Sequence, residues 1–231
     1  MREDLPNARP FSFGEYTDNN RYEILCPRGY RGVVVLQQQK FEILFEIGAY
    51  AINDGYYREA VSSFTSSLER FYEFFIRAFL YQHELDAETV SAAWKHVSNQ
   101  SERQLGGYVI AYTQAFRRPP VLLHPKKVEF RNAVIHKGKI PTRAEAVEYG
   151  DAILALMRPA IREVADTFPQ GVHRIVTEHL AAGYSNVEEG LRSATACMAT
   201  IVSLSAADAT HNSRPLEDAL DAIRQWQTRL L

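Results

Sequence analysis

Cysteines and long apolar runs are both scarce in this sequence. Only Cys26 and Cys197 occur among 231 residues, too few for the disulfide framework of a secreted scaffold, and this favours a reducing compartment. No apolar run approaches the roughly 20 residues that a membrane span needs. The opening Met1-Arg2-Glu3-Asp4 lacks the features of a secretory signal. We therefore expect a cytoplasmic protein with no membrane partner.

An excess of positive charge is lacking as well. The chain has 26 basic and 28 acidic residues, a net charge of -2, so no global basic field attracts nucleic acid. Any contact with RNA must come from a local patch, and one candidate is visible between residues 117 and 143. Its basic residues are Arg117, Arg118, His124, Lys126, Lys127, Arg131, His136, Lys137, Lys139 and Arg143.

Motifs for cofactors and metals are absent too. No Gly-rich phosphate loop, cysteine-histidine pair or carboxylate cluster competes for an active site. Cys26-Pro27, followed by Gly29, resembles half of a zinc knuckle. A zinc site needs four ligands, or three and a water, and no second cysteine lies nearby. The sequence therefore predicts no metal site and no cofactor.

Helical periodicity is what the sequence has in abundance. Apolar residues step by three and four through 37–54 and through 56–82, which predicts two amphipathic helices. Asn53-Asp54-Gly55 separates them and predicts an antiparallel helical hairpin. Thr142 and Glu145 form a capping box that opens a later helix. Further helices are predicted at about 86–98, 104–116, 124–136, 142–165, 171–182, 186–207 and 215–230.

The N-terminal region is predicted to differ from this helical pattern. Residues 1–20 look like an extended arm, and β-rich runs at Tyr22–Cys26 and Val33–Leu36 flank a Pro/Gly turn that indicates a hairpin. The expected fold is all-α, with an N-terminal arm and β-hairpin at 1–36, a helical domain at 37–165 and a C-terminal helical extension at 166–231. The run Ala194–Ala207 is interpreted as a buried helix. The extension could be a second subdomain, a dimer-building element, or both.

The candidate site lies on a short predicted helix that ends near Gly138. Its residues Arg131, Asn132 and His136 fall within six positions of each other. At about 100° per residue, Asn132 and His136 lie one turn apart, while Arg131 lies about 140° from His136. The three side chains can therefore face one groove, with Val128 and Ile135 helping to hold the helix to a core. A guanidinium, an amide and an imidazole suit a phosphodiester through charge stabilisation, positioning and proton transfer.

Arg131-Asn132-x-x-x-His136, followed by Gly138 and Ile140-Pro141-Thr142, resembles the signature of HEPN domains. These are small α-helical domains, many of them metal-independent ribonucleases of toxin, phage-defence and CRISPR systems. The resemblance covers roughly residues 37–160, because the helical hairpin and the capped helix after the motif also match. It implies a HEPN-like bundle whose RNA-cleaving groove lies at a homodimer interface.

The resemblance also implies roles for individual residues. The catalytic residues would be Arg131, Asn132 and His136, and Glu69 on the second helix would support them. An RNA 2′-OH would attack the neighbouring phosphorus and leave a 2′,3′-cyclic phosphate. His136 would transfer protons, Arg131 would stabilise the developing charge, and Asn132 would orient the imidazole or the phosphate. The RNA-binding residues would be Lys126, Lys127, Lys137 and Lys139.

Two other functions remain open at this stage. HEPN-like domains also serve as nucleotide- or protein-binding modules, often with a nucleotidyltransferase-type antitoxin, and the slightly acidic charge leans this way. In a purely structural protein, Arg131 and His136 would make internal hydrogen bonds. Arg174 and His179 repeat the motif spacing. However, isoleucine follows this arginine and the downstream context is missing, so we interpret the pair as ordinary solvated helix residues.

Overall fold

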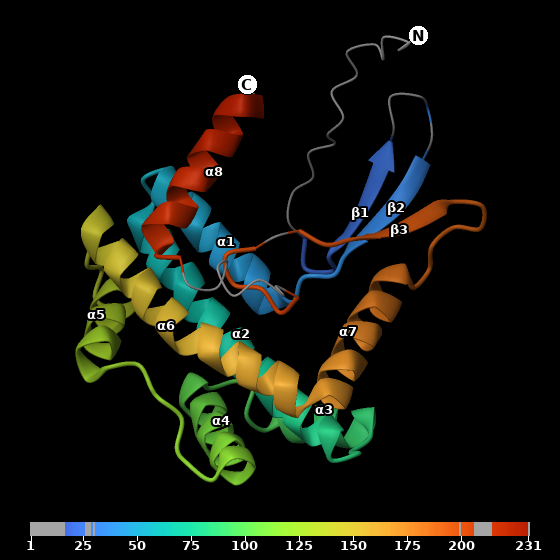
Figure 1. The fold of residues 1–231 in the computed structure, drawn as a ribbon, viewed down its shortest axis with the longest axis horizontal. Helices are drawn as coiled ribbons and strands as arrows, with labels where there is room; N and C mark the ends of the chain where they lie inside the picture. Colours follow the sequence, from blue (N-terminus) through green and yellow to red (C-terminus); the bar gives the residue numbers. More distant parts are fainter. Residues whose placement is uncertain (1–16, 26–28, 30, 199, 206–213, 231) are drawn as a thin grey trace. The chain divides into compact units, whose positions relative to one another are not determined.

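The computed structural model describes residues 17–25, 29, 31–198, 200–205 and 214–230, and this part of the chain is mostly helical (Figure 1). Most of the predicted arm, Cys26 and most of the predicted Pro/Gly turn lie outside the described residues. The chain divides into two compact units. One unit contains the described residues up to Gln37 together with Val176–Met198, and the other contains those of Gln38–Ile175 and Ala199–Leu231. Residues after 165 thus contribute to both units.

Helices build the second unit, and each helix predicted between residues 37 and 165 is present. None of the described helices has the length and apolar character needed to cross a membrane. The helix that crosses from the second unit into the first is α7, Pro169–Tyr184. The others are α1 (Lys40–Asn53), α2 (Tyr57–Gln82), α3 (Ala87–Lys95), α4 (Ser101–Phe116), α5 (Pro125–His136), α6 (Arg143–Thr167) and α8 (Leu216–Leu230).

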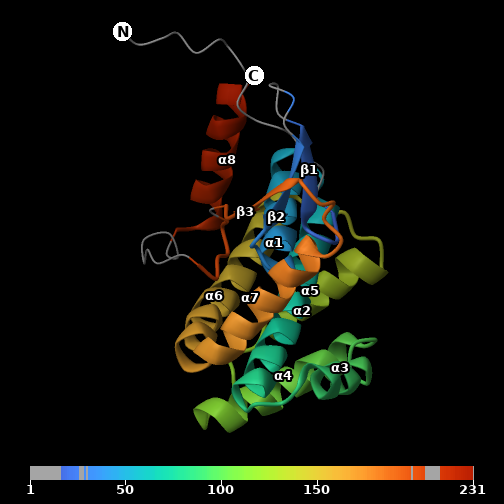
Figure 2. The same ribbon diagram turned by 90° about the vertical axis from the view of Figure 1, so that its right-hand side faces the viewer.

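The long helix α2 is the centre of this unit, with α1, α4, α5 and α6 packed around it (Figures 1 and 2). Its predicted apolar stripe is buried from Val61 to Ala78, as the helical spacing predicts. The ring of Phe64 lies 4.6 Å from that of Phe45 on α1, and Phe75 lies 5.0 Å from Tyr108 on α4. The aromatic stripe is therefore core, and it fixes α2 as the surface on which α5 packs.

Three of the predicted helix-end signals are confirmed. Gly55 adopts a left-handed φ of +85° after α1, a conformation that favours glycine. Asp86 accepts a hydrogen bond from the Thr89 N–H at the start of α3. Thr142 and Glu145 form a reciprocal capping box at the start of α6.

A small sheet forms in the first unit. The predicted hairpin is confirmed as β1 (Arg21–Leu25) paired antiparallel with β2 (Arg31–Leu36). The predicted helix at 186–207 is wrong, because β3 (Arg192–Ala196) pairs parallel with β2. Residues 199, 206 and 207 of that prediction lie outside the described residues. Alanine and serine favour a helix locally, but hydrogen bonds to a strand about 160 residues earlier in the chain override that preference.

Two glutamates on α1 are buried in the helical unit, which the amphipathic pattern did not predict. Glu42 accepts a hydrogen bond from the Leu204 N–H at 2.9 Å, and Glu46 accepts one from the Ile201 N–H at 2.5 Å. Burial raises the pKa of each carboxyl to about 7, and for Glu46 the nearby charge of Glu42 adds to this. The pair therefore ties the segment 200–204 to α1.

Close helix packing at Gly48 yields a test of the core. A Cβ at Gly48 would lie 2.5 Å from Cε1 of Phe64, whose ring is fully buried against Phe45. We expect Gly48→Ala to lower the free energy of unfolding by about 2 kcal/mol through overpacking. Gly106→Ala, in an exposed part of α4 with no atom within 4 Å of the new Cβ, should instead raise it by roughly 0.5–1 kcal/mol. Denaturant unfolding measures both, and equal effects would contradict this packing.

The buried glutamates predict a pH dependence of stability. Because the pKa of Glu46 is about 7 when folded and 4.5 ordinarily, the folded state favours the protonated form. Its contribution to stability is complete below about pH 4.5 and is lost as the pH rises through about 7. Glu46→Gln keeps an oxygen acceptor for Ile201 and should reduce the loss of stability between these pH values by up to roughly 3 kcal/mol. Unfolding measured across this range, with the exposed Glu59→Gln as control, should show a flatter profile for Glu46→Gln alone, and parallel profiles would contradict the prediction.

Candidate functional site

Helix α5 carries the sequence motif and packs against α2 and α6 (Figure 1). Its deepest side chain is Val134, which is fully buried, whereas Val128 and Ile135 are half-buried. The ring of Phe130 lies 5.7 Å from the ring of Tyr149 on α6. Val134 and Phe130 therefore set the rotation of the helix about its axis, and that rotation decides where the motif side chains point.

Local interactions fix both ends of α5. Nδ1 of His124 accepts a hydrogen bond from the Lys126 N–H, and Pro125 occupies the first turn, where it needs no donor. At the other end, the N–H groups of Lys137 and Lys139 both donate to the Ala133 carbonyl. Gly138 between them has a φ of +73°. This tight turn ends the helix at His136.

Arg131 points into the helical unit. Its side chain is half-buried, and its Nε–H is buried without a hydrogen-bond partner among the described residues. Burial raises the pKa of Glu69 on α2, and the positive charge of Arg131 is the largest influence opposing that rise. No hydrogen bond or ion pair joins Arg131 and Glu69 directly in the described structure. The structure thus brings the predicted supporting carboxylate and the predicted arginine into electrostatic range.

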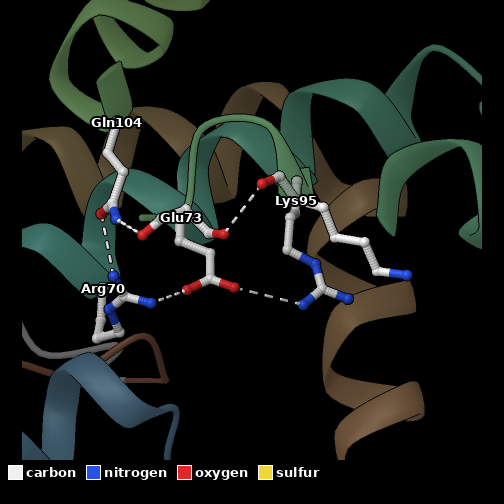
Figure 3. Close-up of polar contacts among 6 residues, drawn as sticks. Arg70, Glu73, Lys95 and Gln104 are labelled. Carbon is white, nitrogen blue, oxygen red and sulfur yellow. Dashed lines mark hydrogen bonds and ion pairs between the residues drawn. The ribbon is translucent and has the colours of Figure 1, made fainter. Parts of the chain in front are cut away.

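The neighbouring Arg70 is engaged elsewhere (Figure 3). Its Nη1 donates to Glu73 at 2.5 Å and its Nη2 donates to Oε1 of Gln104 at 3.0 Å. The side-chain amide of Gln104 in turn donates to the Ser98 carbonyl at 2.6 Å. These contacts tie the polar face of α2 to α4 and to the end of the α3–α4 connection. Arg70 is thereby held away from a direct pairing with Glu69, which leaves Arg131 as the stronger counter-charge.

Two tyrosines that the sequence reasoning did not assign to the site lie in electrostatic range of Arg131. Tyr72 on α2 and Tyr149 on α6 are buried, and burial raises the pKa of both phenols while the charge of Arg131 opposes the rise. The Tyr149 hydroxyl lies 2.9 Å from Oγ1 of Thr65. In a sequence, a tyrosine at a buried helical position is weak evidence of a functional site, because many tyrosines at such positions only pack in the core.

His136 and Asn132 lie apart from this buried cluster. His136 is exposed and Asn132 is half-buried, and neither makes a side-chain hydrogen bond within the described residues. The two are about 40° apart around the helix, whereas Arg131 is about 140° from His136. The structure therefore brings Arg131 to Glu69 but does not bring His136 into contact with either of them.

The predicted RNA-binding lysines fall into two pairs. Nζ of Lys127 lies 2.7 Å from Glu148, and Nζ of Lys139 lies 2.5 Å from Glu145, both carboxylates on α6. The hydrogen bond from Lys139 lowers the pKa of Glu145 to about 2. Lys126 and Lys137 are exposed and make no ion pair with the described residues. A cavity of about 320 Å³ beside α5 is lined by His124, Lys126, Lys127, Phe130, Glu145 and Glu148.

The second arginine-histidine pair of the sequence has structural contacts. Arg174 donates to the Leu85 carbonyl at 3.0 Å and stacks over the ring of Tyr81. Nε2 of His179 lies 2.8 Å from the Leu36 carbonyl oxygen in the first unit. Describing them as ordinary solvated residues was therefore wrong, because both side chains hold neighbouring segments of their own unit.

Comparison with known proteins provides no assignment for this site. No protein-family model, curated protein or solved structure matches the chain. Within the described residues, no group of three or more histidine, cysteine, aspartate or glutamate side chains is placed to hold a metal ion. The chemistry must therefore be argued from the side chains of α5 and the groups that face them.

Proposed function

We propose that this protein is a HEPN-type endoribonuclease that cleaves single-stranded RNA without a metal, in a toxin or phage-defence role. The observation that carries the proposal is the placement of Arg131. Its charge is held on α5 in range of Glu69, while His136 at the end of the same helix faces solvent. The helix thus offers a fixed cation and an accessible proton-transfer group, and exposed Lys137 follows directly.

Arg131 supplies the charge in the proposed reaction. A guanidinium held by packing donates to the non-bridging phosphate oxygens and stabilises the negative charge that develops on them. Because its Nε–H lacks a protein acceptor in the described structure and its side chain is only half-buried, we infer that its outer nitrogens remain available for a phosphate. Glu69 keeps the guanidinium in place and acts as a positioning residue.

His136 supplies proton transfer. The 2′-oxygen of the RNA attacks phosphorus as its proton leaves to a base, and the bond from phosphorus to the 5′-oxygen breaks as that oxygen gains a proton. The products are a 2′,3′-cyclic phosphate and a 5′-hydroxyl. An imidazole can both accept and donate a proton, so it suits either transfer. Asn132, on the same side of α5, orients the imidazole or the phosphate.

A second copy of the chain would supply the second imidazole that the two proton transfers need. One imidazole cannot serve both the attacking and the leaving oxygen without moving. In a symmetric homodimer, the exposed His136 of each copy faces one shared groove, so one takes a proton while the other gives one. The outward position of His136 supports this arrangement.

A second function has its own support. The ion pairs of Lys127 with Glu148 and of Lys139 with Glu145 neutralise two of the four lysines proposed to bind RNA, and the chain carries a net charge of -2. A non-catalytic HEPN-like module that binds a nucleotide or a partner protein, such as a nucleotidyltransferase-type antitoxin, needs fewer unpaired cations. Absence of cleavage together with specific binding would favour this module.

Cleavage of a labelled single-stranded RNA in the presence of EDTA tests the ribonuclease. We expect the wild type to produce fragments ending in a 2′,3′-cyclic phosphate. His136→Ala and Arg131→Ala should each lower the rate by at least about 100-fold, because general acid–base catalysis and oxyanion stabilisation are each worth that much. Asn132→Ala should cost less, because the amide does not titrate.

The matched control is His173→Ala, which removes an exposed histidine of α7 far from the motif in sequence. This variant should cleave like the wild type, and thermal unfolding should confirm that all variants are folded. Cleavage that persists in His136→Ala, or that disappears with chelator, would overturn the metal-free scheme.

A further inference from the structure

A second cavity lies in the helical unit, on a different face of α6 from the one that meets α5. It has a volume of about 390 Å³ and lies along α6 between Asp151 and Arg162, with Arg214 just before α8. Arg158, near its centre, is nine residues after Tyr149, which places it about 180° around the helix from the α5 contact. The cavity is therefore separate from the candidate ribonuclease site.

Positive charge dominates the lining. Among the described residues that line the cavity, three carry guanidinium groups, Arg158, Arg162 and Arg214, and one carries a carboxylate, Asp151. That carboxylate already accepts a hydrogen bond from the Leu216 N–H at 2.9 Å, at the start of α8. Three cations in one cavity repel each other, and this is unusual in a chain whose net charge is negative.

Arg158 is fixed at the base of the cavity by neutral groups. Its Nη1 donates to the Arg214 carbonyl at 2.6 Å and its Nη2 donates to the Ile201 carbonyl at 3.4 Å. Its Nε–H is buried and has no acceptor within the described residues. Burial lowers the pKa of Arg158, and the charge of Asp151 opposes this. A partly buried positive charge is therefore held with no hydrogen-bonded carboxylate to balance it.

The other two arginines are free to bind. Arg162 and Arg214 are exposed, and their guanidinium groups make no hydrogen bond or ion pair with the described residues. Arg162 follows Arg158 by one turn, a spacing at which like charges destabilise a helix. An anion between these groups would relieve that repulsion and could accept paired hydrogen bonds from a guanidinium.

The cavity also offers an acceptor. Pro159 lies inside α6 and has no N–H, so the Ala155 carbonyl lacks its usual donor four residues along the helix. Both residues line the cavity. A hydroxyl group on a bound molecule can donate to this carbonyl, and a fully ionised phosphate cannot. The lining therefore suits a ligand that carries both kinds of group.

We propose that this cavity binds a small organic phosphate of mononucleotide or sugar-phosphate size, with Arg162 and Arg214 on the phosphate and the Ala155 carbonyl on a hydroxyl. The volume falls within the range of small-molecule sites. The proposal does not depend on ribonuclease activity, because none of these residues belongs to the α5 motif.

Calorimetric titration of the full chain tests the site with four probes: inorganic phosphate, ribose 5-phosphate, adenosine 5′-monophosphate and adenosine. Both organic phosphates should bind, with inorganic phosphate weaker and adenosine without measurable binding. Arg162→Ala should weaken binding by about tenfold, or about 1.4 kcal/mol, because it removes a charged hydrogen-bond donor from the phosphate. Tighter binding of adenosine 5′-monophosphate than of ribose 5-phosphate would show that the cavity also recognises the base.

The controls separate this site from the α5 motif. Arg58→Ala, an exposed arginine of α2, and His136→Ala should both bind like the wild type. If no probe binds the wild type at millimolar concentration, or if Arg162→Ala and Arg214→Ala both bind like the wild type, the proposal is overturned. Equal affinity for inorganic phosphate and the organic phosphates would contradict the proposal that the cavity recognises more than the phosphate group.

Discussion

The charge of Arg131 inside the helical unit is the constraint on which the candidate site depends. A guanidinium that is turned toward a core needs a counter-charge, because burying an unpaired ion is costly. Glu69 on α2 provides it from the helix that α5 packs against, while Arg70 beside it is occupied by Glu73 and Gln104. Glu69 is itself partly buried, so each charge lowers the free-energy cost of burying the other. Val134 and Phe130 set the side of α5 that faces inward, and the attraction between Arg131 and Glu69 favours the same orientation.

The position of His136 follows from that orientation. Once Arg131 and Val134 face the core, the helical repeat places His136 about 140° from Arg131, on the solvent side. Gly138 then ends the helix, so the imidazole lies on its last turn rather than within a packed surface. Within one copy, Arg131 therefore lies toward the core and His136 toward solvent. For the ribonuclease that we propose, a groove shared by two copies would let both groups reach the same phosphodiester.

Patterns that are local in sequence predicted most of the helical unit. The apolar stripe of α2, the glycine stop after α1 and the capping box of α6 depend on residues a few positions apart, and all three are present. The strand β3 could not be found this way, because its hydrogen bonds go to β2 at the other end of the chain. The buried carboxylates of Glu42 and Glu46 were missed for the same reason, since their partners are backbone N–H groups of residues 201 and 204.

The candidate site was only partly predictable as well. The positions of Arg131 and His136 along α5 follow from helical spacing, whereas only the family resemblance, and no local pattern, indicates Glu69. That Val134, rather than Val128 or Ile135, is the most deeply buried residue of α5 depends on the shape of the surface formed by α2 and α6. The burial of Tyr72 and Tyr149 around the guanidinium depends on the same three-helix contact. Side-chain spacing alone does not contain this information.

The most direct test of the shared groove is the cleavage rate of a fixed amount of wild-type protein after subunit exchange with increasing amounts of His136→Ala protein. If one phosphodiester needs the histidine of both copies, mixed dimers are inactive, and the rate falls in proportion to the wild-type fraction. Differently tagged chains allow the mixed dimers to be captured and counted in the same samples. A rate that stays constant while mixed dimers form would show that each phosphodiester needs only one His136, and it would contradict a groove that uses the histidines of both copies.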